Sequence, residues 1–175
     1  MDSPIRSPFL IESLPGYSPT IGHLVAMMNY ARSTTLEAVA GLSPAELDFL
    51  LDGEANSIGM LLEHMIWVER GYQANTFGWA IEGEEVERWR LGSDLGEEGR
   101  KQIRGFDLDH YLERLKAIRD RTLAEFAKRD DAWLFEEGEW WGGNVCNNYF
   151  KWFHVFEDEI NHRGQIRIIR KRLPG

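Results

Sequence analysis

The stretch of sequence that decides the fold is Asn147–Arg170, which reads NNYFKWFHVFEDEINHRGQIRIIR. It contains no proline and a single glycine, and its apolar residues recur at helical spacing, which predicts one long helix. At 100° per residue, His154, Asp158 and His162 fall on one strip of this helix. Gln165 continues the strip, which lies beside the aliphatic residues and is therefore expected to face inward.

Three arginines mark the opposite side of this helix, which we expect to face water: Arg163, Arg167 and Arg170. Imidazole and carboxylate groups on an apolar face must be paired, hydrogen-bonded or bound to a metal. A lone inward histidine is more often a hydrogen-bonded core residue than a ligand. Three titratable groups in register also suit a metal site or a catalytic site.

The composition is that of an ordinary globular protein, with 175 residues, 43% hydrophobic residues and 28% charged residues. This length suits one domain, and we expect residues 1–175 to form it. The formal net charge of −9 argues against nucleic-acid binding, which needs a basic face, and against docking on an anionic membrane. No apolar run is long enough to span a bilayer, and the first residues lack the long apolar region of a signal peptide.

The single cysteine, Cys146, excludes an internal disulfide framework and fits a reducing cytoplasm. It lies just before the predicted C-terminal helix, and a helix N-terminus favours the thiolate form of cysteine. A nucleophilic role is therefore conceivable. Because no histidine lies beside it in the sequence, a small buried residue is the favoured interpretation.

Helical periodicity extends to three further segments, at residues 19–40, 56–77 and 107–128. Four amphipathic helices of this length predict an all-α fold, a four-helix bundle, and no segment convincingly predicts a strand. Residues 78–105 and 129–146 form two long connections, of which the first has room only for short helical pieces. Connections of this length indicate that the topology need not be a simple up-and-down arrangement.

Several side chains in these segments carry specific expectations. Leu36 is expected on the buried side of the first helix, and Arg119 on a solvated face of the third. Trp79 and Trp89 either pack over the mouth of a cleft or anchor the first connection, and the second interpretation is favoured. Trp140 begins the run Trp-Trp-Gly-Gly, which suits a loop folded over apolar groups or a wall of a substrate pocket.

Residues that could bind a metal occur on two of the predicted helices. Asp158 and His162 lie one turn apart on the last helix, and His64 lies among methionine and leucine residues on the inward side of the second. Two imidazoles and one carboxylate can form a three-ligand site with open positions for water or substrate. Such a site polarises a substrate atom or activates water or a thiol. The pair on the last helix is a common pattern, so the site depends on the fold bringing the third ligand to it.

Two segments resemble the DinB/YfiT-like family of four-helix-bundle proteins. Asn56–Glu69, which reads NSIGMLLEHMIWVE, is similar to the family's Ser-Ile-Gly opening, followed by an inward histidine and then a glutamate. His154–Gln165, which reads HVFEDEINHRGQ, is similar to the closing helix of the family, which ends in His-Arg-Gly-Gln. With the helix at 19–40 and the following Ser-Pro-Ala-Glu-Leu turn, the resemblance covers most of the chain.

The resemblance implies a metal-binding triad of one histidine from the second main helix and two from the last. His64 matches the first position and His162 the last, while the middle position, usually histidine, is Asp158 here. A carboxylate shifts the preference of a site toward harder metals, and zinc, nickel, manganese and iron all remain compatible with the set. Alternatively, Asp158 orients His64 without binding metal. His154 could then serve instead, although it lies about 12 Å along the helix axis from His162.

The function that this resemblance implies is that of a metal-dependent enzyme acting on a small-molecule substrate. The family includes transferases and isomerases that use low-molecular-weight thiols such as bacillithiol or mycothiol, and hydrolase chemistry is a related option. The resemblance also implies a homodimer. The alternative is a non-catalytic helical protein that binds a small ligand or acts in a stress response, and the seven tryptophans and the long first connection favour it.

Overall fold

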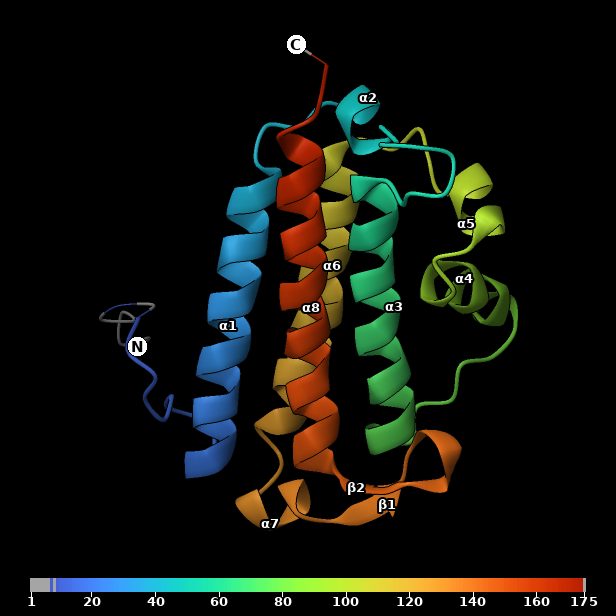
Figure 1. Cartoon of the computed structure of the whole chain (residues 1–175). Coiled ribbons are helices and arrows are strands. Elements are labelled where there is room, and N and C mark those ends of the chain that lie inside the picture. Colours follow the sequence, from blue (N-terminus) through green and yellow to red (C-terminus); the bar gives the residue numbers. More distant parts are fainter. Residues whose placement is uncertain (1–6, 8, 175) are drawn as a thin grey trace.

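Four long helices form the body of the molecule in the computed structural model, which describes residue 7 and residues 9–174 (Figure 1). They are α1 (Pro19–Val39), α3 (Ile58–Phe77), α6 (Leu108–Phe126) and α8 (Asn148–Arg170). The expected all-α four-helix bundle is confirmed. None of the helices in the described part of the chain has the length and apolar character that crossing a bilayer requires.

Shorter elements fill the connections between these helices. One short helix lies between α1 and α3, and two lie in the first long connection. The second long connection contains one more short helix and a small hairpin. They are α2 (Pro44–Leu47), α4 (Glu84–Ser93), α5 (Glu97–Gln102), α7 (Asp131–Leu134), β1 (Glu137–Glu139), the 3₁₀ turn η1 (Trp141–Gly143) and β2 (Val145–Asn147). The antiparallel β1–β2 pair corrects the expectation of no strand. Three-residue strands are too short to produce a visible alternation in the sequence.

The first long connection changes the direction in which the chain runs through the bundle. It carries α4 and α5 along the outside of α3 and returns to the end where α3 began (Figure 1). There the backbone N–H of Gly105 donates to the Asp48 carboxylate, 2.8 Å away, just after α2. Helix α6 therefore runs parallel to α3, and the bundle is not a simple up-and-down one.

Local sequence features begin and end several of the helices. Ser43 and Glu46 form a capping box at α2, and Gly41 follows α1 with a positive φ of 75°. Helix α8 begins at a cap in which the Asn147 side chain accepts a hydrogen bond from the N–H of Phe150. Each cap satisfies a backbone group that the helix itself leaves without a partner.

Helix α1 is capped from a distant part of the chain. The carboxylate of Asp131, at the start of α7, accepts hydrogen bonds from the Ser18 hydroxyl at 2.6 Å, the Thr20 N–H at 2.9 Å and the Ile21 N–H at 3.1 Å. Burial raises the pKa of this carboxyl, but the hydrogen bonds from Ser18 and Thr20 outweigh burial and lower it from 3.8 to about 2. One acidic side chain thus joins the beginning of α7 to the beginning of α1.

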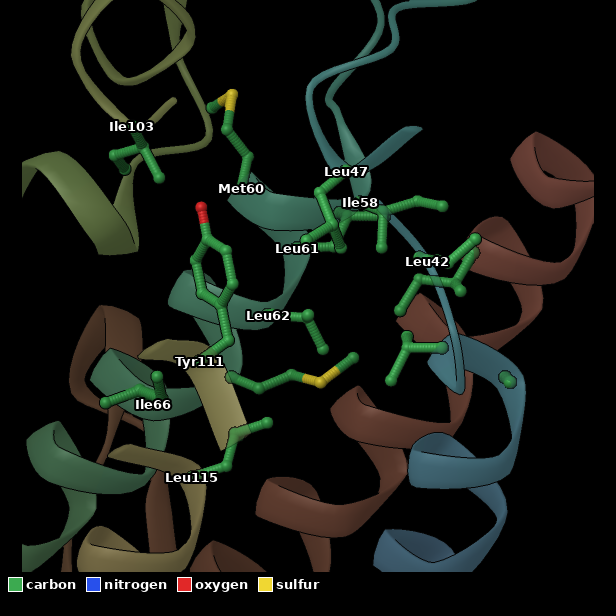
Figure 2. Close-up of a cluster of buried hydrophobic side chains, with 14 of the residues drawn as sticks. Leu42, Leu47, Ile58, Met60, Leu61, Leu62, Ile66, Ile103, Tyr111 and Leu115 are labelled. Carbon is green, nitrogen blue, oxygen red and sulfur yellow. The ribbon is translucent and has the colours of Figure 1, made fainter. Parts of the chain in front are cut away.

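Two apolar clusters occupy the two ends of the bundle. The first gathers side chains from the beginnings of α3 and α6 and the ends of α1 and α8, with Tyr111 and Leu115 of α6 facing Leu61 and Leu62 of α3 (Figure 2). The second, around Trp152, joins the beginnings of α1 and α8 to the end of α6 and to α7. Both clusters consist of large aliphatic and aromatic side chains removed from water, which provides the main driving force for folding.

Between these clusters lies a fully buried ion network to which each long helix contributes one side chain. Arg32 of α1 contacts Glu159 of α8 at 2.8 Å and Glu69 of α3 at 3.2 Å. Arg119 of α6 contacts the same two carboxylates, Glu69 at 2.9 Å and Glu159 at 3.3 Å. Burial alone would raise the pKa of Glu69, but the charges of Arg119 and Arg32 outweigh burial and hold that pKa below its usual value.

Three sequence-based expectations about exposure are wrong. Arg119 was expected to be solvated, but it is only 5% exposed, because its partners come from other helices. Leu36 is 39% exposed, and isolated apolar side chains on a surface cost little. Gln165 is also exposed, so the inward strip of α8 ends at His162.

We expect Arg119→Met to lower the free energy of unfolding by about 3–5 kcal/mol, because the change leaves two buried carboxylates with one arginine between them. Arg121→Met is the matched control. Arg121 lies two residues further on and is exposed over the Trp79 ring, so we expect a loss of about 1 kcal/mol or less. Equal losses for the two variants in denaturant unfolding would contradict the central role of the network.

We expect Asp131→Ala to lower the free energy of unfolding by about 1 kcal/mol at neutral pH, because it removes the cap of α1. The pKa of Asp131 is depressed in the folded state, so its stabilising contribution is present above pH 3.8 and is lost as the pH falls through about 2. The difference in the free energy of unfolding between Asp131→Ala and the wild type should therefore shrink as the pH falls from 3.8 to about 2. Glu113→Gln, on an exposed face of α6, is the control, and unfolding measured against pH gives both results.

Candidate metal centre

The three side chains expected to form a metal site lie together between α3 and α8. His64 projects from α3, and Asp158 and His162 project from α8 one turn apart. One potential ligand atom from each lies within 4.8 Å of the others. The Asp158 carboxylate approaches both imidazoles, with Oδ2 3.8 Å from His64 Nε2 and Oδ1 3.3 Å from His162 Nε2.

The orientation of His64 is fixed by the main chain of α4. Its Nδ1 lies 2.9 Å from the carbonyl oxygen of Gly92, which can only accept a hydrogen bond, so Nδ1 carries the proton. The lone pair of Nε2 is then available toward Asp158. Such a hydrogen bond to the second ring nitrogen is the usual way in which a protein orients a metal-binding histidine.

Glycine is required at position 92 for a steric reason. A Cβ there would lie 1.9 Å from Cδ1 of Trp67 on α3, far inside van der Waals contact. The absence of a side chain lets α4 lie against the indole and brings its carbonyl within reach of His64. The first long connection therefore contributes directly to the centre, through its backbone.

The electrostatics of the centre favour neutral imidazole. Burial lowers the pKa of His64, and this effect exceeds the opposing influence of the Asp158 charge. A neutral imidazole is the form that binds metal. Two buried atoms, Asp158 Oδ2 and His162 Nδ1, have no hydrogen-bond partner among the described residues. A cation between the three groups would give Asp158 Oδ2 a partner, so the residues present fit a divalent ion.

A cavity of about 500 Å³ adjoins this centre. It lies among α3, α4, the β1–β2 hairpin and the first half of α8, and His64 and Asp158 form part of its wall. The remaining lining residues are Trp67, Val68, Gly71, Tyr72, Asn75, Trp89, Ser93, Glu139, Trp140 and His154. A cavity of this size, next to a cluster of titratable groups, is the usual form of a small-molecule site.

The structure separates the other candidate residues. Trp89 and Trp140 both line the cavity, which corrects the favoured interpretation of Trp89 as an anchor of the first connection. Trp79 instead packs on Phe77, with ring centroids 5.3 Å apart. His154 also lines the cavity, but its Nδ1 lies 2.9 Å from Glu157 and it is not among the three converging groups. Cys146 lies half-buried in β2 and is not among the residues that line the cavity or converge at the centre.

Gly92 and Tyr72 are among the residues of the site that were not anticipated from the sequence. Tyr72 lies eight residues after His64 and so on the same strip of α3, a periodicity that could have identified it. Burial raises the pKa of Tyr72 to about 12, so the phenol stays protonated. Gly92 had no such indication, because a backbone carbonyl leaves no trace in the residue type.

The solved structures that are similar to this fold include the following two. A DinB-like protein from Bacillus cereus ATCC 10987 has a TM-score of 0.58 and 16% sequence identity, over 87% of this chain and 95% of that one. The colibactin self-resistance protein ClbS, in complex with a dsDNA, has a TM-score of 0.63 and 17% identity, over 88% and 97%. At these identities the likeness shows the fold alone. No protein of curated function is significantly similar to the chain in sequence.

The fold is the one seen in a DinB-like protein, in agreement with the class of four-helix-bundle proteins that the sequence motifs had indicated. Within that class the match is more specific. Residues 23–175 match the family described as Mycothiol-S-transferase, and the chain belongs to it. The match includes α3, α6, α8, all but the first four residues of α1 and both long connections, and so every residue of the centre and of the cavity.

Proposed function

We propose that this protein is a metal-dependent enzyme that transfers a low-molecular-weight thiol to a small-molecule acceptor. His64, Asp158 and His162 would hold the metal. The observation that carries this proposal is the convergence of these three side chains within 4.8 Å beside a cavity of about 500 Å³. Membership of the Mycothiol-S-transferase family supports thiol chemistry over hydrolysis or isomerisation.

The donor set consists of two imidazole nitrogens and one carboxylate, which is compatible with zinc, nickel, manganese or iron. A divalent ion held there would lower the pKa of a thiol and so supply the thiolate nucleophile at neutral pH. The alternative role of Asp158, as a partner that only orients His64, has less support. The Gly92 carbonyl already orients that ring, and Asp158 Oδ2 lacks a hydrogen-bond partner among the described residues.

The side chains around the centre would position the reactants and exclude water. Trp67 closes one side of the cavity and is held by a 2.6 Å hydrogen bond from its indole N–H to Glu63. On another side, the Trp140 indole donates to the Tyr72 hydroxyl at 3.1 Å. These bonds fix the walls before any ligand enters, so little ordering is needed on binding.

A second candidate function is non-catalytic binding of a small ligand, which the aromatic walls of the cavity favour. Retention of an aromatic ligand by a protein that neither binds metal nor turns over thiol would support this alternative. A homodimer and a cytoplasmic location remain predictions. So does the absence of nucleic-acid binding, which the net charge of −9 favours and the DNA complex of ClbS opposes.

We expect His162→Ala to reduce the affinity for a divalent ion by about 100-fold or more, because it removes one of three ligands. Asp158→His should retain binding and shift the preference toward softer ions. Gln165→Ala, an exposed position on the same helix, is the control and should bind as the wild type does. Metal content and titration with zinc, nickel and manganese measure these effects. Equal metal content in wild type and His162→Ala would mean that the ligand set is misassigned.

We expect metal-loaded protein to form thioether products from mycothiol or bacillithiol and an electrophilic acceptor. Chelation should abolish this turnover, and restoring the ion should recover it. His162→Ala should lose the activity while Gln165→Ala keeps it. Loss of free thiol and mass spectrometry of the product provide the measurement. Turnover that survives chelation would remove the metal from the proposal.

A further inference from the structure

The walls of the cavity are aromatic and come from three separate elements. Tyr72 belongs to α3, Trp89 to α4, and Trp140 immediately follows β1. The Trp140 ring also meets the His154 ring edge-on, with centroids 5.5 Å apart, and His154 meets Tyr72 in the same manner at 6.0 Å. These contacts form a continuous wall of three rings, and the indole of Trp89 adds a fourth from α4.

A glycine on α3 accommodates the fourth ring. A Cβ at Gly71 would lie 3.3 Å from the indole nitrogen of Trp89, tighter than an ordinary contact. Without that Cβ, the indole lies close to the helix and the space beside it stays open. At 38% exposure, Trp89 still presents part of its ring to solvent. A flat guest can therefore reach aromatic faces on more than one side.

The charge of the cavity has one sign. Two carboxylates, Glu139 and Asp158, line it, and the lining residues that the structure describes include no lysine or arginine. When Asp158 serves the metal centre, Glu139 at the end of β1 remains as the negative group of the outer part. Within the described residues, no ion pair engages the Glu139 carboxylate. A cation among the rings would be attracted electrostatically by the ring faces and by this carboxylate, whereas an anion would be repelled by both.

We propose that this cavity selects acceptors that are flat, aromatic and positively charged, and that it discriminates against anions. The role of these ligands as thiol acceptors rests on the proposed function, but the preference of the cavity for binding them does not. It depends on Tyr72, Trp89, Trp140 and Glu139, none of which is a metal ligand. The preference should therefore be measurable in chelator-treated protein as well as in metal-loaded protein.

The test uses three probes of similar shape: the 1-methylquinolinium cation, neutral 1-naphthalenemethanol and the 1-naphthoate anion. Ligand-detected NMR titration of the full chelator-treated chain gives the three dissociation constants. We expect the cation to bind about tenfold more tightly than the anion, with the neutral probe between them. Equal binding of cation and anion, tighter binding of the anion, or no binding of any probe would overturn the proposal.

Variants locate the preference in the cavity. Glu139→Gln should reduce the ratio of cation to anion affinity to about threefold or less, while its matched control, the exposed Glu136→Gln, should keep the wild-type ratio. Trp89→Leu should weaken the cation about fivefold. Because this indole is on the surface of α4, the variant should fold, and its helical circular dichroism checks this. An unchanged ratio in Glu139→Gln would refute the assignment. Selective binding without metal uptake would contradict the proposed catalysis and leave the ligand class standing.

Discussion

The buried network of Arg32, Glu69, Arg119 and Glu159 constrains everything else in this structure. Each long helix supplies one charged group, and the four groups meet between two apolar clusters. Sliding any helix by one turn, about 5.4 Å, would leave buried charges without partners, at a cost of several kcal/mol. The apolar clusters provide most of the driving force, but they tolerate many arrangements of similar volume. The ion network selects one register among them.

That register also determines where the candidate ligands lie. Glu159 directly follows Asp158 on α8, and Glu69 lies five residues after His64 on α3. The shared arginines fix the height along the bundle axis at which Glu69 and Glu159 lie opposite each other. The height at which Asp158 and His64 approach each other is therefore fixed as well. The network turns its charged groups toward the bundle interior, and the neighbouring strips of α3 and α8 face the cavity. A constraint on folding thus positions the candidate metal site.

The sequence was informative wherever a side chain repeats along one helix. The spacing of Asp158 and His162 predicted two of the three candidate ligands, and the inward position of His64 predicted the third once a bundle was expected. The sequence was uninformative about Arg119, because its partners lie 40 and 50 residues away and helical periodicity places a charged residue outside by default. It gave no indication that Gly92 is needed, because the interacting group is a carbonyl oxygen common to all residues.

Part of the cavity wall comes from a different part of the fold than the candidate metal ligands. His64, Asp158 and His162 all lie on long helices, whereas Trp89, Glu139 and Trp140 lie in the two long connections. Structures that share this bundle at 16–17% identity include one in complex with dsDNA, so the bundle by itself does not specify a ligand. Ligand choice in such a scaffold is expected to follow the connections, as it does in other folds that carry function on loops.

The hydrogen bond between the Gly92 carbonyl and His64 has a consequence for how this protein can change over evolution. The contact is made by the main chain, so exposed side chains of α4 can be replaced without altering the orientation of the histidine. Trp89, three residues earlier on the same helix, is part of the cavity wall. Substitutions on α4 can therefore change which ligands the cavity binds without changing the geometry of the centre, provided that position 92 remains glycine.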